Sequence, residues 1–145
     1  MKLGAQGEAL IKSFETLVLT GYLDVGVPAA GWGHRGPGII VGQTYTVEQA
    51  QAWFDSDTAS AVAAVSRCVD VALTQNQFDA LVSFTYNLGS GALAHSTLLA
   101  LVNRNEMLRA ADEFLRWDHV GGVESAGVER RRKAERALFM QPVLA

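Results

Sequence analysis

Two acidic residues near the start of the chain, Glu15 and Asp24, have the type and the setting that acid–base chemistry requires. Glu15 ends a short apolar segment beside Phe14 and Leu17, which suits a carboxyl group that donates a proton. Asp24 lies between a β-prone segment and a glycine-rich loop, which suits an ionised carboxylate. Hydrolysis of a glycosidic bond uses such a pair. The spacing alone does not single out this chemistry, because isolated acids are also common on protein surfaces.

The other reactive residues do not indicate a metal or cofactor site. The three histidines, His34, His95 and His119, are isolated, and none forms a metal-binding motif with neighbouring acids. Residues 31–36 superficially resemble a phosphate-binding loop but match neither a P-loop nor a dinucleotide-binding motif. The single cysteine, Cys68, excludes an internal disulfide and is expected to be a small core residue. We therefore expect no metal and no organic cofactor.

The composition is that of a single domain over residues 1–145, and we expect a monomer. Hydrophobic residues make up 49% of the chain and charged residues 19%, which argues against disorder. The formal net charge of −3 argues against a nucleic-acid partner. The apolar stretches are too short for a transmembrane helix, and the N-terminus lacks the apolar region of a signal peptide.

The elements that must position the two carboxyl groups are a short helix and a small sheet. Apolar residues at helical spacing predict a helix over residues 7–15, and residues 17–23 are rich in β-formers. Residues 24–42 are dense in glycine and proline, which predicts turns and a small hairpin sheet. A capping box at Thr46 and Gln49 then begins a helical region.

The rest of the chain is predicted to be helical. A second capping box at residues 74–77 begins a helix that Gly89 and Gly91 are expected to end in left-handed turns. Further helices are predicted over residues 97–103, 107–117 and 128–139. Leu108 is expected to face inward with its apolar neighbours. The fold class is therefore α+β, mostly α: a small N-terminal β-hairpin region and a helical body, forming two lobes with a cleft between them.

A series of short motifs extends along nearly the whole chain. Near the N-terminus they are Phe14-Glu15, Tyr22-Leu23-Asp24 and Gly31-Trp32-Gly33-His34. Further along they are residues 73–89, 96–99 and 127–139. Together they resemble the first helix and turn signature, the central helix and the closing helix of phage-type lysozymes, glycoside hydrolase family 24. The resemblance implies a lysozyme-like fold over residues 1–145.

The resemblance also implies an activity. Members of this family are endolysins that hydrolyse the β-1,4 bond between N-acetylmuramic acid and N-acetylglucosamine in peptidoglycan, which lyses the bacterial cell. Glu15 matches the family's general acid, and Asp24 matches the carboxylate that positions or activates water on the opposite face. The family inverts the anomeric centre, which predicts carboxyl groups roughly 6.5–9.5 Å apart. No cofactor is implied.

One position departs from the family pattern. The family's third catalytic residue is the threonine of a Thr-x-Gly-x-Gly-His turn, and here that position is Ala29. A threonine hydroxyl would hold the attacking water, and the loss of such a contact can cost a factor of about 10²–10³ in rate. A different hydroxyl group could stand in for it. The alternative function is therefore a catalytically weakened member that binds peptidoglycan without cleaving it.

Other residues match family positions less specifically. The resemblance places Tyr86, Asn87 and Thr97 as substrate-binding residues facing the cleft, with core packing as the alternative for Tyr86. His34 is expected to form a structural pair with Asp57.

The basic run at residues 130–136 matches a helix that sends an arginine towards the catalytic glutamate, and Arg131 is the expected residue. A solvated helix face is the alternative interpretation of this run. A third hypothesis, a non-enzymatic helical interaction domain, also fits it. The resemblance further implies cytoplasmic accumulation in the producing bacterium, access to the wall once the membrane is permeabilised, and no insertion into the membrane.

Overall fold

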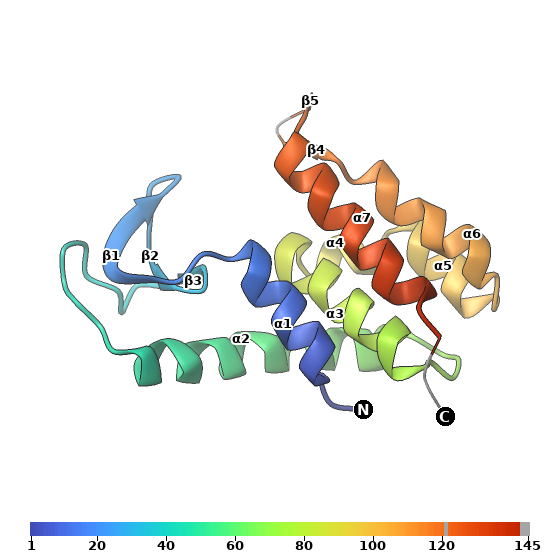
Figure 1. The fold of residues 1–145 in the computed structure, drawn as a ribbon, viewed down its shortest axis with the longest axis horizontal. Helices are drawn as coiled ribbons and strands as arrows, with labels where there is room; N and C mark the ends of the chain where they lie inside the picture. Colours follow the sequence, from blue (N-terminus) through green and yellow to red (C-terminus); the bar gives the residue numbers. More distant parts are fainter. Residues whose placement is uncertain (121, 143–145) are drawn as a thin grey trace. The chain divides into compact units, whose positions relative to one another are not determined.

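A computed structural model describes residues 1–120 and 122–142, which fall into two compact units. One unit comprises Ile11–Ser60, and the other comprises Met1–Leu10 together with the described residues from Ala61 onward. The two boundaries fall inside the helices α1 (Ala5–Phe14) and α2 (Val47–Cys68), which are drawn in Figure 1. In the described residues helices predominate beside a three-stranded sheet and a two-stranded sheet, which confirms the α+β, mostly α class. The single domain and the cleft stay predictions.

The unit Ile11–Ser60 holds the predicted hairpin sheet. Three antiparallel strands lie in the order β1 (Val18–Asp24), β2 (Val27–Gly31) and β3 (His34–Arg35). Val25 and Gly26 connect β1 to β2 with φ of 49° and 78°. Positive φ at both central residues is the mark of a type I′ turn, whose twist matches that of the strands it joins.

One face of the sheet packs on α2. Ala30, Ile39 and Tyr45 form a buried cluster against which Trp53 of α2 packs. The Tyr45 hydroxyl accepts a hydrogen bond from the Ile40 backbone N–H at 2.9 Å, so this phenol has a structural role. The capping box predicted before α2 is present, since the Gln49 N–H donates to Thr46 Oγ1 at 3.1 Å. These contacts fix the sheet on its own helix.

The other unit is helical. Its elements are α3 (Gln75–Leu88), α4 (Ser90–Ala94), α5 (Thr97–Asn103), α6 (Met107–Glu113), the 3₁₀ turn Phe114–Arg116, β4 (His119–Val120), β5 (Val123–Glu124) and α7 (Ala126–Met140). Helices α3 and α7 pack side by side (Figure 1). The second predicted capping box begins α3 at Thr74. The predicted bounds of α5 are confirmed.

Four local predictions were wrong. Gly91 does not end a helix but lies inside α4, because Gly89, with φ of 95°, already ends α3 and caps α4. Leu108 is 72% exposed, because the buried side of α6 is formed by Ala110 and Ala111. The helix predicted over residues 107–117 ends as α6 at Glu113, and Phe114–Arg116 form a 3₁₀ turn, after which β4 and β5 form a short hairpin. Cys68 is only partly buried, since it is the last residue of α2.

A buried charge cluster joins α7 to α3. Glu135 is fully buried, with Oε1 3.0 Å from Arg132 Nε and Oε2 3.3 Å from Arg131 Nε. The Ser83 hydroxyl of α3 donates to Glu135 Oε2 at 2.6 Å. Burial raises the pKa of Glu135, and the charges of Arg132 and Arg131 oppose this rise. The carboxylate therefore neutralises two guanidinium groups within one helical turn.

Removing this central charge should destabilise the helical unit. Glu135→Gln leaves two buried guanidinium groups without a counter-charge, and we expect a loss of about 3–5 kcal/mol in the free energy of unfolding, measured by urea denaturation. Glu129→Gln is the matched control, because Glu129 forms an i,i+4 pair with Lys133 on the same helix at the surface. That control should cost about 0.5 kcal/mol or less. Equal losses in the two variants would contradict the assigned role of Glu135.

Candidate active site

The carboxylate of Glu15 lies against a glycine turn. Glu15 follows the last residue of α1, and its N–H donates to the Ile11 carbonyl at 3.0 Å, which extends the helical hydrogen bonding by one residue. Gly33, between β2 and β3, has φ of +76°, and a Cβ built there would lie 2.7 Å from Glu15 Oε2. A side chain at position 33 would therefore collide with the carboxylate. Glycine at this turn leaves room for the predicted general acid.

Asp24, the last residue of β1, is held by an arginine of β3. Arg35 Nε lies 3.4 Å from Asp24 Oδ2, and Arg35 Nη2 donates to the Asp24 carbonyl at 3.1 Å. Both side chains are about half-exposed. The arginine therefore fixes the backbone and the carboxylate of the same residue while leaving the carboxylate accessible to water. Arg35 could not be predicted as a site residue, because nothing in the sequence pairs β3 with the end of β1.

The strand register places Asp24 on the same sheet face as Ala29. Tyr22 pairs with Ala29, and Ala29 pairs with Arg35, so these three residues form one row across the sheet. Directly opposed residues in antiparallel strands project from the same face, as do residues two apart in one strand. Asp24 is therefore on this face too. The side chain at position 29 is 0% exposed and carries no hydroxyl group.

The negative charges of both candidate carboxylates act on the phenol of Tyr22. Burial raises the pKa of Tyr22, and the negative charges of Asp24 and Glu15 raise it further, whereas Arg35 lowers it. Both carboxylates therefore act on one phenol. Although Tyr22 belongs to the Tyr-x-Asp motif, it was not among the predicted site residues. Its spacing of two residues from Asp24 in a β-prone segment was the available signal.

The predicted partner of His34 is present. His34 Nδ1 lies 2.8 Å from Asp57 Oδ2 on α2, and the imidazole stacks on Trp53 with ring centroids 5.0 Å apart. These contacts connect β3 to α2 within one unit. They support the expected structural role of His34, which lies next to the Gly33 turn.

The remaining predicted site residues belong to the helical unit. Tyr86 is half-buried near the end of α3, and Thr97 is exposed at the start of α5. Asn87 is exposed, and its Oδ1 accepts a hydrogen bond from Arg132 Nη2 at 2.7 Å. Arg131 takes part in the buried cluster with Glu135. The contact of Arg131 with Glu15, and the binding roles of the other three residues, stay predictions.

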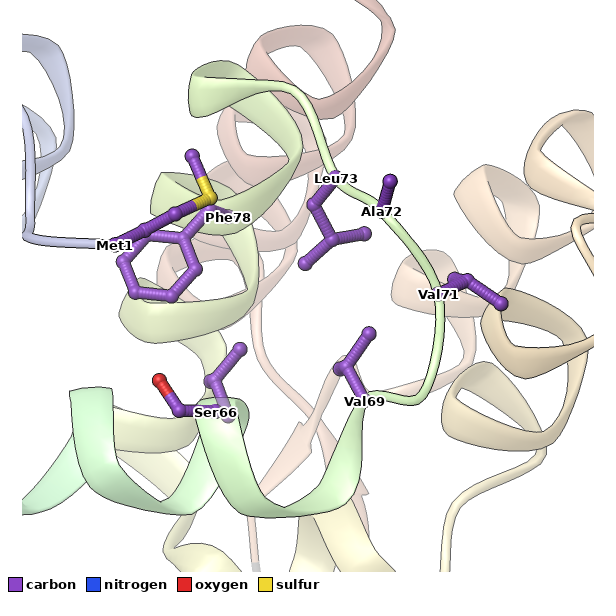
Figure 2. Close-up of a pocket in the computed structure, with 8 residues that line it drawn as sticks. Met1, Ser66, Val69, Val71, Ala72, Leu73 and Phe78 are labelled. Carbon is purple, nitrogen blue, oxygen red and sulfur yellow. The ribbon is translucent and has the colours of Figure 1, made fainter.

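The helical unit also contains an apolar pocket of about 380 Å³ (Figure 2). Apart from Ser66, the side chains that line it are hydrophobic, and they include Met1, Val69, Leu73 and Phe78. No carboxyl, imidazole or amine side chain lines it, so it does not provide acid–base chemistry. Among the described residues, no group of three or more His, Cys, Asp or Glu side chains is placed to hold a metal ion.

Comparison with known proteins gives the family. A sequence model described as phage lysozyme matches residues 12–135. The chain belongs to the phage lysozyme family. The match includes the helix end that carries Glu15, the whole sheet and most of α7.

Two curated relatives illustrate the range of this family. The endolysin of Bacillus phage PZA is 42% identical over 142 residues, which cover 96% of this chain and 55% of that protein. The endolysin of Salmonella phage P22 is 37% identical over 145 residues, which cover 97% of this chain and 99% of that protein. The chain thus spans about half the length of the Bacillus phage relative and nearly all of the Salmonella phage relative.

Solved structures of the phage lysozyme family share the fold. The muramidase domain of SpmX from Asticaccaulis excentricus superposes with a TM-score of 0.90 at 38% identity, covering 97% of this chain and 99% of that domain. The endolysin from Escherichia coli O157:H7 phage FAHEc1 also gives a TM-score of 0.90, at 37% identity, covering 100% of this chain and 97% of that protein. The lysozyme-like fold is therefore confirmed.

The contact between the Glu15 carboxylate and the Gly33 turn can be tested by substitution. Gly33→Ala should displace the Glu15 carboxylate and cost about 1–2 kcal/mol, because an alanine at positive φ is strained. Gly26→Ala is the matched control, because φ is +78° there and a Cβ would have no neighbour within 4 Å. We expect similar destabilisation of both variants, and a change in the NMR signal of the Glu15 carboxyl carbon in Gly33→Ala only. An unchanged Glu15 signal would contradict the contact.

Proposed function

We propose that this chain is a muramidase that hydrolyses the β-1,4 bond between N-acetylmuramic acid and N-acetylglucosamine in peptidoglycan, as an endolysin does. The observation that carries the proposal is that one small sheet holds both carboxyl groups, with Glu15 against the Gly33 turn and Asp24 at the end of β1 beside Arg35. Membership of the phage lysozyme family supports it, as do relatives named endolysin and muramidase domain.

The reaction assigns different roles to the two carboxyl groups. Glu15 donates its proton to the glycosidic oxygen as the bond from that oxygen to the anomeric carbon breaks. Asp24 accepts a proton from a water molecule whose oxygen forms the new bond to the anomeric carbon from the opposite side. The products are a free hemiacetal of inverted configuration and an alcohol. Arg35 keeps the Asp24 carboxylate in place for this step.

The helical unit supplies the other groups in this proposal. Tyr86, Asn87 and Thr97 bind the sugar chain. The protein works as a monomer without a cofactor, and it acts on the wall from the cytoplasmic side once the membrane is permeabilised. No described helix is long and apolar enough to span a membrane.

The function can be tested by comparing three variants on permeabilised bacterial walls. Glu15→Gln and Asp24→Asn should each lower the rate of turbidity loss and of reducing-end release by about 10²–10⁴-fold, because each removes one proton-transfer step. Glu48→Gln is the control, because Glu48 is an exposed acid of the same unit at the start of α2. It should retain the wild-type rate.

The same test can also show binding without hydrolysis, because Ala29 lacks the hydroxyl group of the family pattern. If the wild type and Glu15→Gln bind walls equally and neither releases reducing ends, the chain is a peptidoglycan-binding protein, and the proposed hydrolysis is wrong.

A further inference from the structure

The catalytic proposal leaves one task unassigned. An attacking water must point its oxygen at the anomeric carbon while it gives a proton to Asp24, and a single hydrogen bond to Asp24 does not fix that orientation. A second polar group next to Asp24 is needed. Ala29 cannot provide it, because a methyl group neither donates nor accepts a hydrogen bond.

Few residues of the sheet could supply the hydroxyl group that Ala29 lacks. Within β1, β2 and β3, only Thr20 and Tyr22 carry a hydroxyl group. Thr20 lies in the stretch where the β1–β2 register shifts, and it is bridged to Thr44 instead of to β2. Tyr22, in contrast, is the direct cross-strand partner of Ala29 and lies two residues from Asp24. Cβ atoms of such a pair are about 4.5–5.5 Å apart, so the Tyr22 side chain leaves the sheet beside position 29, on the face that carries Asp24.

The Tyr22 hydroxyl is available for this task. Among the described residues, no side chain or backbone group forms a hydrogen bond with it. Tyr45, in the same unit, differs in this respect, because its hydroxyl accepts a hydrogen bond from Ile40. Tyr22 is also only partly buried, so water can reach it. A partly exposed phenol without a protein partner, next to a carboxylate, is suited to bind water.

We propose that Tyr22 takes over the role of the missing hydroxyl and orients the attacking water together with Asp24. The water donates one O–H to the Asp24 carboxylate and the other to the Tyr22 phenol oxygen, which leaves a lone pair of the water oxygen facing the anomeric carbon. The proton passes to Asp24, and Tyr22 exchanges none. This inference rests on the proposed hydrolase function.

The surrounding charges keep the phenol in the form that this role requires. Burial and the carboxylates of Asp24 and Glu15 raise the pKa of Tyr22, and Arg35 opposes them. The phenol therefore stays protonated and neutral at neutral pH. A neutral oxygen beside Asp24 avoids a further negative charge where the carboxylate must accept a proton.

The test is a double-mutant cycle between positions 22 and 29. Tyr22→Phe removes only the hydroxyl, and we expect kcat for reducing-end release to fall by about 10–100-fold with KM nearly unchanged. In the Ala29→Thr background the same substitution should lower kcat by less than about threefold, because threonine then supplies the hydroxyl. Ala29→Ser is the smaller replacement to use if threonine at this buried position prevents folding.

Tyr45→Phe is the matched control, because it also removes one phenol hydroxyl from the same unit. It should lower the unfolding midpoint without lowering kcat of the folded protein. Equal losses of kcat for Tyr22→Phe with Ala29 and with Thr at position 29 would overturn the inference, and so would a fall in stability without a fall in kcat.

The outcomes also separate this inference from the proposed function. A wild type whose hydrolysis depends on Glu15 but is unaffected by Tyr22→Phe overturns the inference alone. A wild type without hydrolysis beside an active Ala29→Thr also overturns it, because Tyr22 then fails to replace the hydroxyl. Inactivity of both proteins overturns the proposed function and the inference together.

Discussion

The candidate active site depends on the register of a three-stranded antiparallel sheet. Pairing of Tyr22 with Ala29, and of Ala29 with Arg35, decides which side chains lie on the face that carries Asp24. The alternate residue Ala30 lies on the opposite face, in the cluster with Trp53 of α2. Because side chains alternate between faces, the burial of one face fixes the composition of the other. The packing of the sheet therefore determines which side chains lie beside Asp24.

Because of the same pairing, the hydroxyl group beside Asp24 does not have to come from one fixed position in the sequence. Residues 22 and 29 are opposite each other, so either strand can present a hydroxyl group on the face that carries Asp24. Loss of a polar side chain on one strand can then be offset by a neighbour that was already present. The phage lysozyme family pattern places this hydroxyl on β2, and our inference places it on β1 in this chain.

Local signals in the sequence predicted much of the fold. The capping boxes at Thr46 and Thr74 predicted the starts of α2 and α3, because a cap is a contact between near neighbours. Leu108 was misplaced, because the turn of α6 that meets its neighbours is decided by tertiary packing. Glu15 and Asp24 could be selected by their setting and by the family resemblance. Arg35 could not, since its contact with Asp24 follows from strand pairing.

Because the turn at Val25 and Gly26 is tight, odd and even changes in the length of the hairpin have different effects on its side chains. Inserting or deleting one residue here would shift the pairing by one and turn every side chain of β2 to the opposite face. Ala30 would then join the face that carries Asp24, and Ala29 would enter the apolar cluster. A change of two residues would keep each side chain on its face. Where no bulge or longer turn absorbs the change, the hairpin keeps its two faces only if its length changes by an even number of residues.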